Sequence, residues 1–203
     1  MSTSPTTLSR SDLIGMYGTI GLGAIGAALT VWAMIARLAE VLPERGIPVL
    51  VPFSGETAAL PIGPGGTDLI VDVDRAVVTV DDPAAATFFA LVAQPIVTGL
   101  AVLVGIVLLC LFCVNLARGR AFAASTVRIV TAGTGVLMAG WVLGWLFQTM
   151  GVNGALSAVS DYEYDGVLFE TDFAVIFGIL ALGAISAAFQ IGHRLQRENE
   201  GLV

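Results

Sequence analysis

Residues 83–116 read "PAAATFFALVAQPIVTGLAVLVGIVLLCLFCVNL" and carry no charged side chain over 34 positions. A helix of this length measures about 50 Å at 1.5 Å per residue, whereas the hydrocarbon core of a bilayer is about 30 Å thick. The segment therefore predicts a membrane-spanning helix that tilts, bends or extends beyond the lipid. Asp82 followed by Pro83 is typical of a helix start, and Pro95 predicts a bend about three turns further on.

The whole chain shares this apolar character. Hydrophobic residues make up 56% of its 203 residues, charged residues make up 12%, and the mean hydropathy is +0.89. Soluble domains carry roughly 25% charged residues, so we expect an integral membrane protein rather than a water-soluble fold. We expect spanning helices at 13–38, 83–116, 126–150 and 173–191, extracellular loops at 39–82 and 151–172, and cytoplasmic segments at 1–12, 117–125 and 192–203.

The first spanning segment could instead be a cleaved signal peptide. Its apolar run of about 24 residues exceeds the roughly 7–15 residues of a signal-peptide core. Its charged leader is also thin, because Arg10 is the one basic residue before it. We therefore expect a retained helix.

Charge is distributed unequally between the two sets of connecting segments. The side with both termini and the 117–125 loop carries six arginines and three acidic residues, a net charge of +3. The side with the two long loops carries three arginines and thirteen acidic residues, a net charge of −10. Cytoplasmic segments of membrane proteins are enriched in basic residues, so we expect both termini in the cytoplasm.

The first long loop, residues 43–82, predicts a small antiparallel sheet. "IPVLVPF" at 47–53 alternates apolar residues and leads into "TAALPI" at 57–62. "DLIVDV" at 68–73 and "AVVTV" at 76–80 are rich in β-branched residues. Three or four short strands are expected, resting on the helix ends because so small a sheet is not stable alone.

The predicted fold is a membrane all-α four-helix bundle with a small extracellular antiparallel β-sheet between helices 1 and 2. This layout is claudin-like in outline, which is an analogy of architecture only. In the second outer loop, "DYEYDGVLFETD" at 161–172 predicts either a further strand or a solvated acidic turn.

Small residues recur at a spacing of four in three of the spanning segments. Such residues let helix backbones approach closely in lipid, where no hydrophobic force drives helices together. We expect packing within the chain, with an interface to a second copy as the alternative. The candidate helix-packing residues are Gly15, Thr19, Gly23, Ala27, Gly140, Gly144, Gly183 and Ala187.

Neither catalysis nor transport is indicated by the spanning segments. "GLGAIG" at 21–26 matches the dinucleotide pattern G-x-G-x-x-G, but it lies within an apolar span that phosphate does not reach. Cys110 and Cys113 form C-x-x-C in an apolar helix and are expected to be inert thiols. No charged residue lies in the middle of a span, which argues against a proton-coupled transporter. We expect a protein that is not an enzyme, with no cofactor and no metal.

Polar residues at membrane depth are expected to form hydrogen bonds between helices rather than to line a substrate path. They are Gln94, Thr98, Thr131, Thr134, Gln148 and Gln190.

The tail, "GHRLQRENEGLV" at 192–203, resembles the C-terminal signature of a bacterial family of small membrane proteins, domain-of-unknown-function family 2975. That signature is a G-x-x-L-x-x-E-N-E-L-T-V-like sequence, matched here by Gly192, Leu195, Glu198, Asn199, Glu200 and Val203. A second family stretch, G-x-P-F-[ST]-x-x-N, has its counterpart in "RGRAFAASTVRIV" at 118–130. Gly119 and Phe122 fit this pattern, while Ala121 replaces the proline and Ala123 replaces the hydroxyl residue.

The resemblance implies four helices in the bacterial cytoplasmic membrane and no established activity. Members are often encoded beside a small helix-turn-helix regulator, which implies a membrane partner for a cytoplasmic transcription factor and no direct nucleic-acid binding. The candidate partner-binding residues are Gly119, Phe122, Leu195, Glu198 and Asn199. The alternative is an accessory or structural subunit of a homo- or hetero-oligomeric membrane complex, and the third hypothesis is a small-solute transporter or channel.

Overall fold

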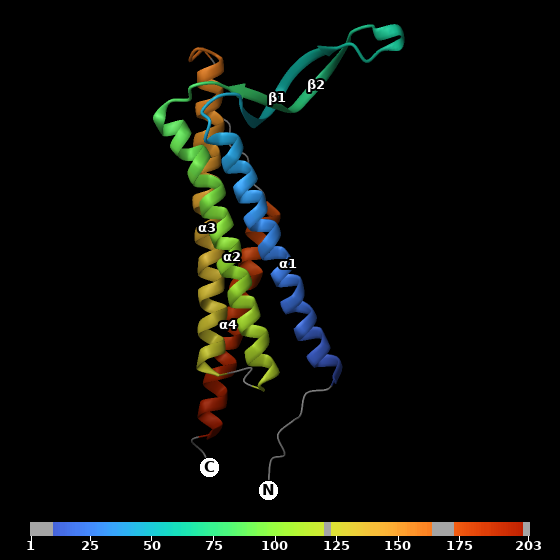
Figure 1. The fold of residues 1–203 in the computed structure, drawn as a ribbon. Helices are drawn as coiled ribbons and strands as arrows, with labels where there is room; N and C mark the ends of the chain where they lie inside the picture. Colours follow the sequence, from blue (N-terminus) through green and yellow to red (C-terminus); the bar gives the residue numbers. More distant parts are fainter. Residues whose placement is uncertain (1–9, 120–122, 164–172, 201–203) are drawn as a thin grey trace. The chain divides into compact units, whose positions relative to one another are not determined.

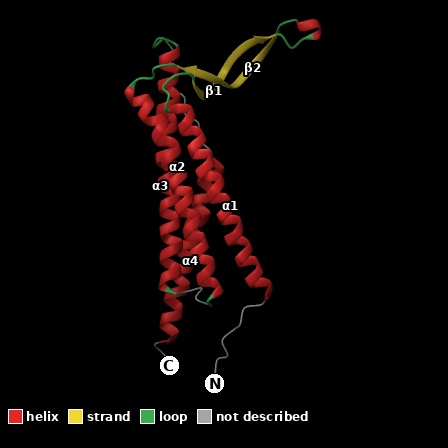
Figure 2. Ribbon diagram, in the orientation of Figure 1, coloured by secondary structure: helices red, strands yellow, loops and turns green. Residues whose placement is uncertain are grey.

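The structure is a computed structural model and describes residues 10–119, 123–163 and 173–200. Figure 1 and Figure 2 show the long helices and a β-hairpin. In chain order the elements are α1 (Arg10–Val41), β1 (Ile47–Leu60), the short 3-10 helix η1 (Pro64–Gly66), β2 (Leu69–Val80), α2 (Ala85–Ala117), α3 (Ala124–Val159) and α4 (Phe173–Glu200). The predicted four helices with an antiparallel sheet between the first two are confirmed.

All four helices contain a stretch long and apolar enough to cross a membrane. The candidate spans are Ile14–Val41, Ala85–Ala117, Ala124–Val159 and Phe173–Leu195. A bilayer core takes about 20 helical residues, so the second and third spans, of 33 and 36 residues, exceed it by several turns. The chain is therefore a multi-pass integral membrane protein.

The chain forms two compact units, whose boundaries fall within α1, α2 and α3 and at the start of α4. Unit 1 comprises Met1–Ile35, Ile96–Leu143 and Asp172–Val203, and unit 2 comprises Ala36–Pro95 and Gly144–Thr171. Of the eleven buried apolar residues in the described part of the chain, ten belong to unit 2 and only Cys113 belongs to unit 1. Large apolar side chains are exposed in both units, such as Leu22 and Phe177 in unit 1 and Ile70 and Val77 in unit 2. Apolar side chains of a spanning helix can face lipid instead of a protein core.

The core of unit 2 forms where the base of the hairpin meets the ends of three helices. Its buried members are Val41, Ile47, Val49, Val51, Val80, Leu91, Val152, Ala155 and Leu156. The alternate positions 47, 49 and 51 of β1 share this core, as their predicted common face requires. Two glycines of α3 bring it close to α2: a Cβ on Gly151 would lie 2.9 Å from Leu91 Cδ2, and one on Gly154 would overlap Thr87.

The hairpin has two long strands rather than the three or four short strands that the sequence predicts. β1 and β2 pair antiparallel from Ile47–Val80 at the base to Leu60–Leu69 at the tip. The predicted break in the first strand is a bulge between Pro52 and Glu56, where Gly55 has φ 81°. A glycine with positive φ suits a bulge as well as a turn, so composition does not separate the two. Residues 164–172 of the acidic stretch lie outside the described residues.

The aspartates before α2 do not cap it as predicted. The helix begins at Ala85, and Asp82 has φ 46°, which is not the extended conformation of an N-cap residue. The pair closes the base of the hairpin instead. The backbone N–H of Gly46 donates to Asp81 Oδ1 at 2.7 Å, and that of Asp82 donates to the carbonyl of Glu44 at 3.0 Å.

Candidate functional site

Within unit 1, α1 and α2 approach each other at the small residue Gly23. A Cβ built there would lie 3.1 Å from Cys110 Sγ and 3.3 Å from Ile106 Cγ2. Further along, a Cβ on Gly99 would lie 3.1 Å from Met34 Sδ. Both glycines therefore leave room for a side chain of the facing helix.

The approach of α2 and α3 in unit 1 is closest at Gly140, which is buried. A Cβ on Gly140 would overlap the methyl group of Ala101, and the Cα of Ala101 is only 3.6 Å from that position. A Cβ on Gly105 would lie 3.1 Å from Leu137 Cδ2. Because the obstacle at Gly140 is close to backbone, relief there would require the helices to separate.

The other predicted packing positions are in varied surroundings. A Cβ on Gly15 or on Gly183 would have no described atom within 4 Å. Thr19 donates its hydroxyl to the carbonyl of Gly15 at 3.0 Å, a bond within its own helix. Ala27 is half-buried, Gly144 is buried and Ala187 is exposed. The spacing of four thus includes positions with a facing helix and positions without one.

A polar contact joins α3 to α4 inside unit 1. The hydroxyls of Thr131 and Ser186 lie 3.0 Å apart, and Gln190 Nε2 donates to Thr131 Oγ1 at 3.4 Å. Ser186 is only 5% exposed, so its hydroxyl is satisfied within the chain. Thr134, in contrast, donates to the carbonyl of Val130 in its own helix.

An apolar cavity of about 270 Å³ lies between α2, α3 and α4 in unit 1. Leu108, Leu137 and Ile185 contribute to its wall. Phe112 and Phe189 also line it, with their rings edge to face and their centroids 5.6 Å apart. Apart from Thr134, the side chains that line this cavity are apolar, and two of the lining residues are glycines.

The family-like stretch after α2 forms a helix end and a helix start. Gly119 has φ 70°, and its N–H donates to the carbonyl of Leu116 at 2.9 Å, as in a glycine-terminated helix. The carbonyl of Ala123 accepts the N–H of Val127 at 3.1 Å, which places Ala123 at the N-cap of α3. Phe122 lies outside the described residues.

The family-like tail continues α4 as far as Glu200. Leu195 is 55% exposed, and Arg194 Nε lies 3.0 Å from Glu198 Oε1, one turn further along. Asn199 belongs to the helix, but its side chain lies outside the described part. The tail thus presents an apolar residue beside an ion pair.

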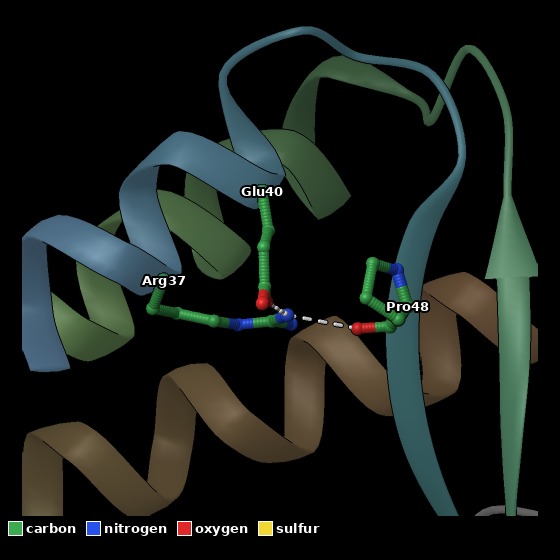
Figure 3. A network of polar contacts seen from close by, with 3 residues as sticks. All are labelled: Arg37, Glu40 and Pro48. Carbon is green, nitrogen blue, oxygen red and sulfur yellow. Dashed lines mark hydrogen bonds and ion pairs between the residues drawn. The ribbon is translucent and has the colours of Figure 1, made fainter.

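Unit 2 contains a larger cavity, of about 390 Å³, which the sequence analysis did not identify. At its edge Arg37 Nη1 donates to Glu40 Oε2 at 2.8 Å and to the carbonyl of Pro48 at 2.9 Å, as Figure 3 shows. Gln94 and Gln148 add two amide groups to the lining. The available signal in the sequence was Arg37 itself, the first charged residue after 24 uncharged positions.

The Arg37 side chain is positioned by its two acceptors. Both contacts use Nη1, and the structure records no partner for Nε or Nη2 among the residues it describes. The side chain is 28% exposed, so this second edge of the guanidinium is reachable. The described residues contain no group of three His, Cys, Asp or Glu that could hold a metal ion. The guanidinium and the two amides of the lining are groups that can bind a ligand through hydrogen bonds.

Comparison of the chain with protein-family models, with curated proteins and with solved structures finds no match. The resemblance to family 2975 thus depends on the two sequence stretches, 118–130 and 192–203, themselves.

Proposed function

We propose that the protein is a non-enzymatic membrane regulator of family 2975 type, which binds a cytoplasmic factor such as a small helix-turn-helix regulator through the end of α4. The observation that supports this proposal most is the continuation of α4 to Glu200, beyond the predicted span 173–191. The nine residues from position 192 to 200 add about 13 Å of helix at 1.5 Å per residue. A projecting helix end is a surface that a soluble domain can bind.

The chemistry of this helix end supports a protein partner. Leu195 and Glu198 are three residues apart and therefore share one face of the helix. Glu198 forms an ion pair with Arg194, and both side chains of the pair are more than half exposed. A lone apolar side chain flanked by charges can enter a pocket of a partner while the charges fix its orientation. The net charge of +3 on this side supports its assignment to the cytoplasm.

A matched pair of variants tests the proposal. Leu195→Ala with Glu198→Ala removes the face described above. Gln196→Ala with Glu200→Ala removes the same formal charge about 150° around the helix, at 100° per residue. Both proteins are purified from cells in mild detergent, and co-purifying proteins are quantified by mass spectrometry.

We expect a cytoplasmic partner whose recovery falls at least tenfold in the first variant and stays at the wild-type level in the second. Membrane abundance should be equal in all three proteins. Equal recovery in both variants would contradict the proposal and leave the tail as an orientation signal only.

The hairpin favours a second candidate function, an accessory subunit of a membrane complex. β1 and β2 pair only with each other among the described residues, so each leaves one edge unpaired. Ile62 and Ile70 near the tip are 64% and 81% exposed. Isolated two-stranded sheets are marginally stable in water, and open strand edges pair readily with another chain. A co-purifying membrane or extracytoplasmic protein that is lost in an Ile70→Lys variant would favour this function over the first.

A further inference from the structure

Two polar groups that line the cavity of unit 2 lie about one bilayer thickness along α2 and α3 from Arg118 and Arg128. Arg37 is the first charged residue after the uncharged part of α1. Gln148 follows Arg128 by 20 residues, which is about 30 Å of helix and matches the thickness of a bilayer core. Gln94 precedes Arg118 by 24 residues, or about 36 Å. These spacings place Gln94 and Gln148 near the hairpin-side boundary of the hydrocarbon core, where Arg37 also ends the uncharged stretch of α1.

The rest of the lining is apolar. Leu91 and Val152 of the buried core contribute to it, together with Val49, Val77 and Phe147. A volume of about 390 Å³ lies within the range of about 300–1,000 Å³ typical of small-molecule sites. A cavity with apolar walls and a few polar groups suits an amphiphile better than a fully polar solute.

The Nε–Nη2 edge of the Arg37 guanidinium indicates the negatively charged group of the ligand. Its Nε and Nη2 form the flat pair of donors that bind two oxygens of a phosphate or carboxylate at once. Anchoring through Nη1 to Glu40 and Pro48 holds this pair of donors in a fixed orientation before any ligand binds.

The Glu40 carboxylate indicates the positively charged group of the ligand. Only its Oε2 receives the guanidinium, and the side chain is 52% exposed, so Oε1 can accept from a further donor. The two charged residues at the cavity have opposite signs, which suits a ligand that carries both a negative and a positive group.

We propose that this cavity binds the headgroup of a phospholipid that carries a primary ammonium, such as phosphoethanolamine, from the leaflet on the hairpin side. The phosphodiester binds the Nε–Nη2 edge of Arg37, the ammonium donates to Glu40, and apolar parts of the lipid lie against the apolar lining. This assignment concerns unit 2 and does not depend on a cytoplasmic partner of the tail.

The test measures lipid binding to the full chain, delipidated in detergent, by native mass spectrometry. The ligands are dioctanoyl lipids with phosphoethanolamine, phosphocholine or phosphoglycerol headgroups, and soluble glycerophosphoethanolamine without acyl chains. We expect the phosphoethanolamine lipid to bind roughly tenfold more tightly than the phosphocholine lipid, whose quaternary ammonium donates no hydrogen bond. Equal binding of these two lipids, or equal binding of the soluble headgroup, would overturn the assignment.

Variants distinguish the role of each group. Arg37→Gln should weaken binding roughly ten- to hundredfold, since it removes charge-assisted hydrogen bonds. Glu40→Gln should reduce the preference for phosphoethanolamine over phosphocholine. Arg45→Gln removes one exposed positive charge from the same unit outside the cavity lining and should leave binding unchanged. Wild-type binding by Arg37→Gln would overturn the proposal.

A second variant tests the site in case Arg37→Gln destabilises the base of the hairpin. Val77 lines the cavity and is 62% exposed, so Val77→Phe fills space there without altering any charge. We expect this variant to keep the wild-type melting temperature and to bind the phosphoethanolamine lipid at least tenfold more weakly. Unchanged binding would place the lipid elsewhere on the chain.

Discussion

Three glycines of unit 1 provide a graded measure of how closely its helices pack. A methyl group added at Gly140 would overlap the methyl of Ala101, close to the backbone of α2. One added at Gly23 would lie 3.1 Å from Cys110 Sγ, a side-chain atom that can shift. One added at Gly15 would have no described atom within 4 Å. The three sites therefore differ in their surroundings while each lies inside a helix.

The expected magnitudes follow from two opposing effects. Replacing glycine by alanine inside a helix contributes up to about 1 kcal/mol of helix propensity at every site. Overpacking against a rigid neighbour costs about 1–3 kcal/mol. We expect Gly15→Ala to be neutral or more stable than wild type by up to about 1 kcal/mol, and Gly23→Ala to lie close to wild type. Gly140→Ala should be less stable than Gly15→Ala by about 1–3 kcal/mol.

Reversible unfolding in mixed micelles of a mild detergent and sodium dodecyl sulfate measures these differences. Far-ultraviolet circular dichroism follows the loss of helix, and Gly15→Ala serves as the internal control for helix propensity. Equal free energies of unfolding for Gly15→Ala and Gly140→Ala would refute the reasoning, because Gly140 would then face no rigid neighbour.

Two further substitutions test local hydrogen bonds. Ala123→Ser should stabilise the protein by about 0.5–2 kcal/mol, because serine at the N-cap of α3 can accept an unpaired N–H; an unchanged free energy of unfolding would show that residue 123 is not the cap. Asp81→Ala should destabilise unit 2 by about 1 kcal/mol and accelerate hydrogen exchange of the Gly46 amide, which loses its acceptor. Asp68→Ala, an exposed acidic control on the same loop, should leave that exchange rate unchanged.

The spans were predictable because length and hydropathy depend on long runs of residues rather than on any single contact. The glycine spacing was less informative. The spacing predicts a packing surface at both Gly23 and Gly15. In the structure only Gly23 has a neighbouring helix close to it, and the sequence pattern does not show where that helix lies. The close approach of Gly151 and Gly154 to α2 was missed, since it occurs in unit 2 rather than in a predicted span.

Unit 2 was predictable only in part. Alternation along 47–53 gave the core-facing side of β1, because side chains of a strand alternate between two faces. The roles of Asp81 and Asp82 were not predictable, since the same residues can cap a helix or close a hairpin, and the choice depends on how near Glu44 and Gly46 lie. The lining of the cavity at Arg37 comes from α1, both strands, α2 and α3, which are separated in the sequence, so no local pattern indicates it.

The central claim is the topology predicted from the charge distribution, with the 39–82 and 151–172 loops outside the cell and the tail of α4 in the cytoplasm. Single cysteines at Ser54, Ser160 and Asn199, in a protein whose Cys110 and Cys113 are replaced by serine, test it with a membrane-impermeant maleimide. The claim predicts labelling at positions 54 and 160 in intact cells, and at 199 only after the cells are permeabilised. Labelling at 199 in intact cells, with none at 54 or 160, would contradict it.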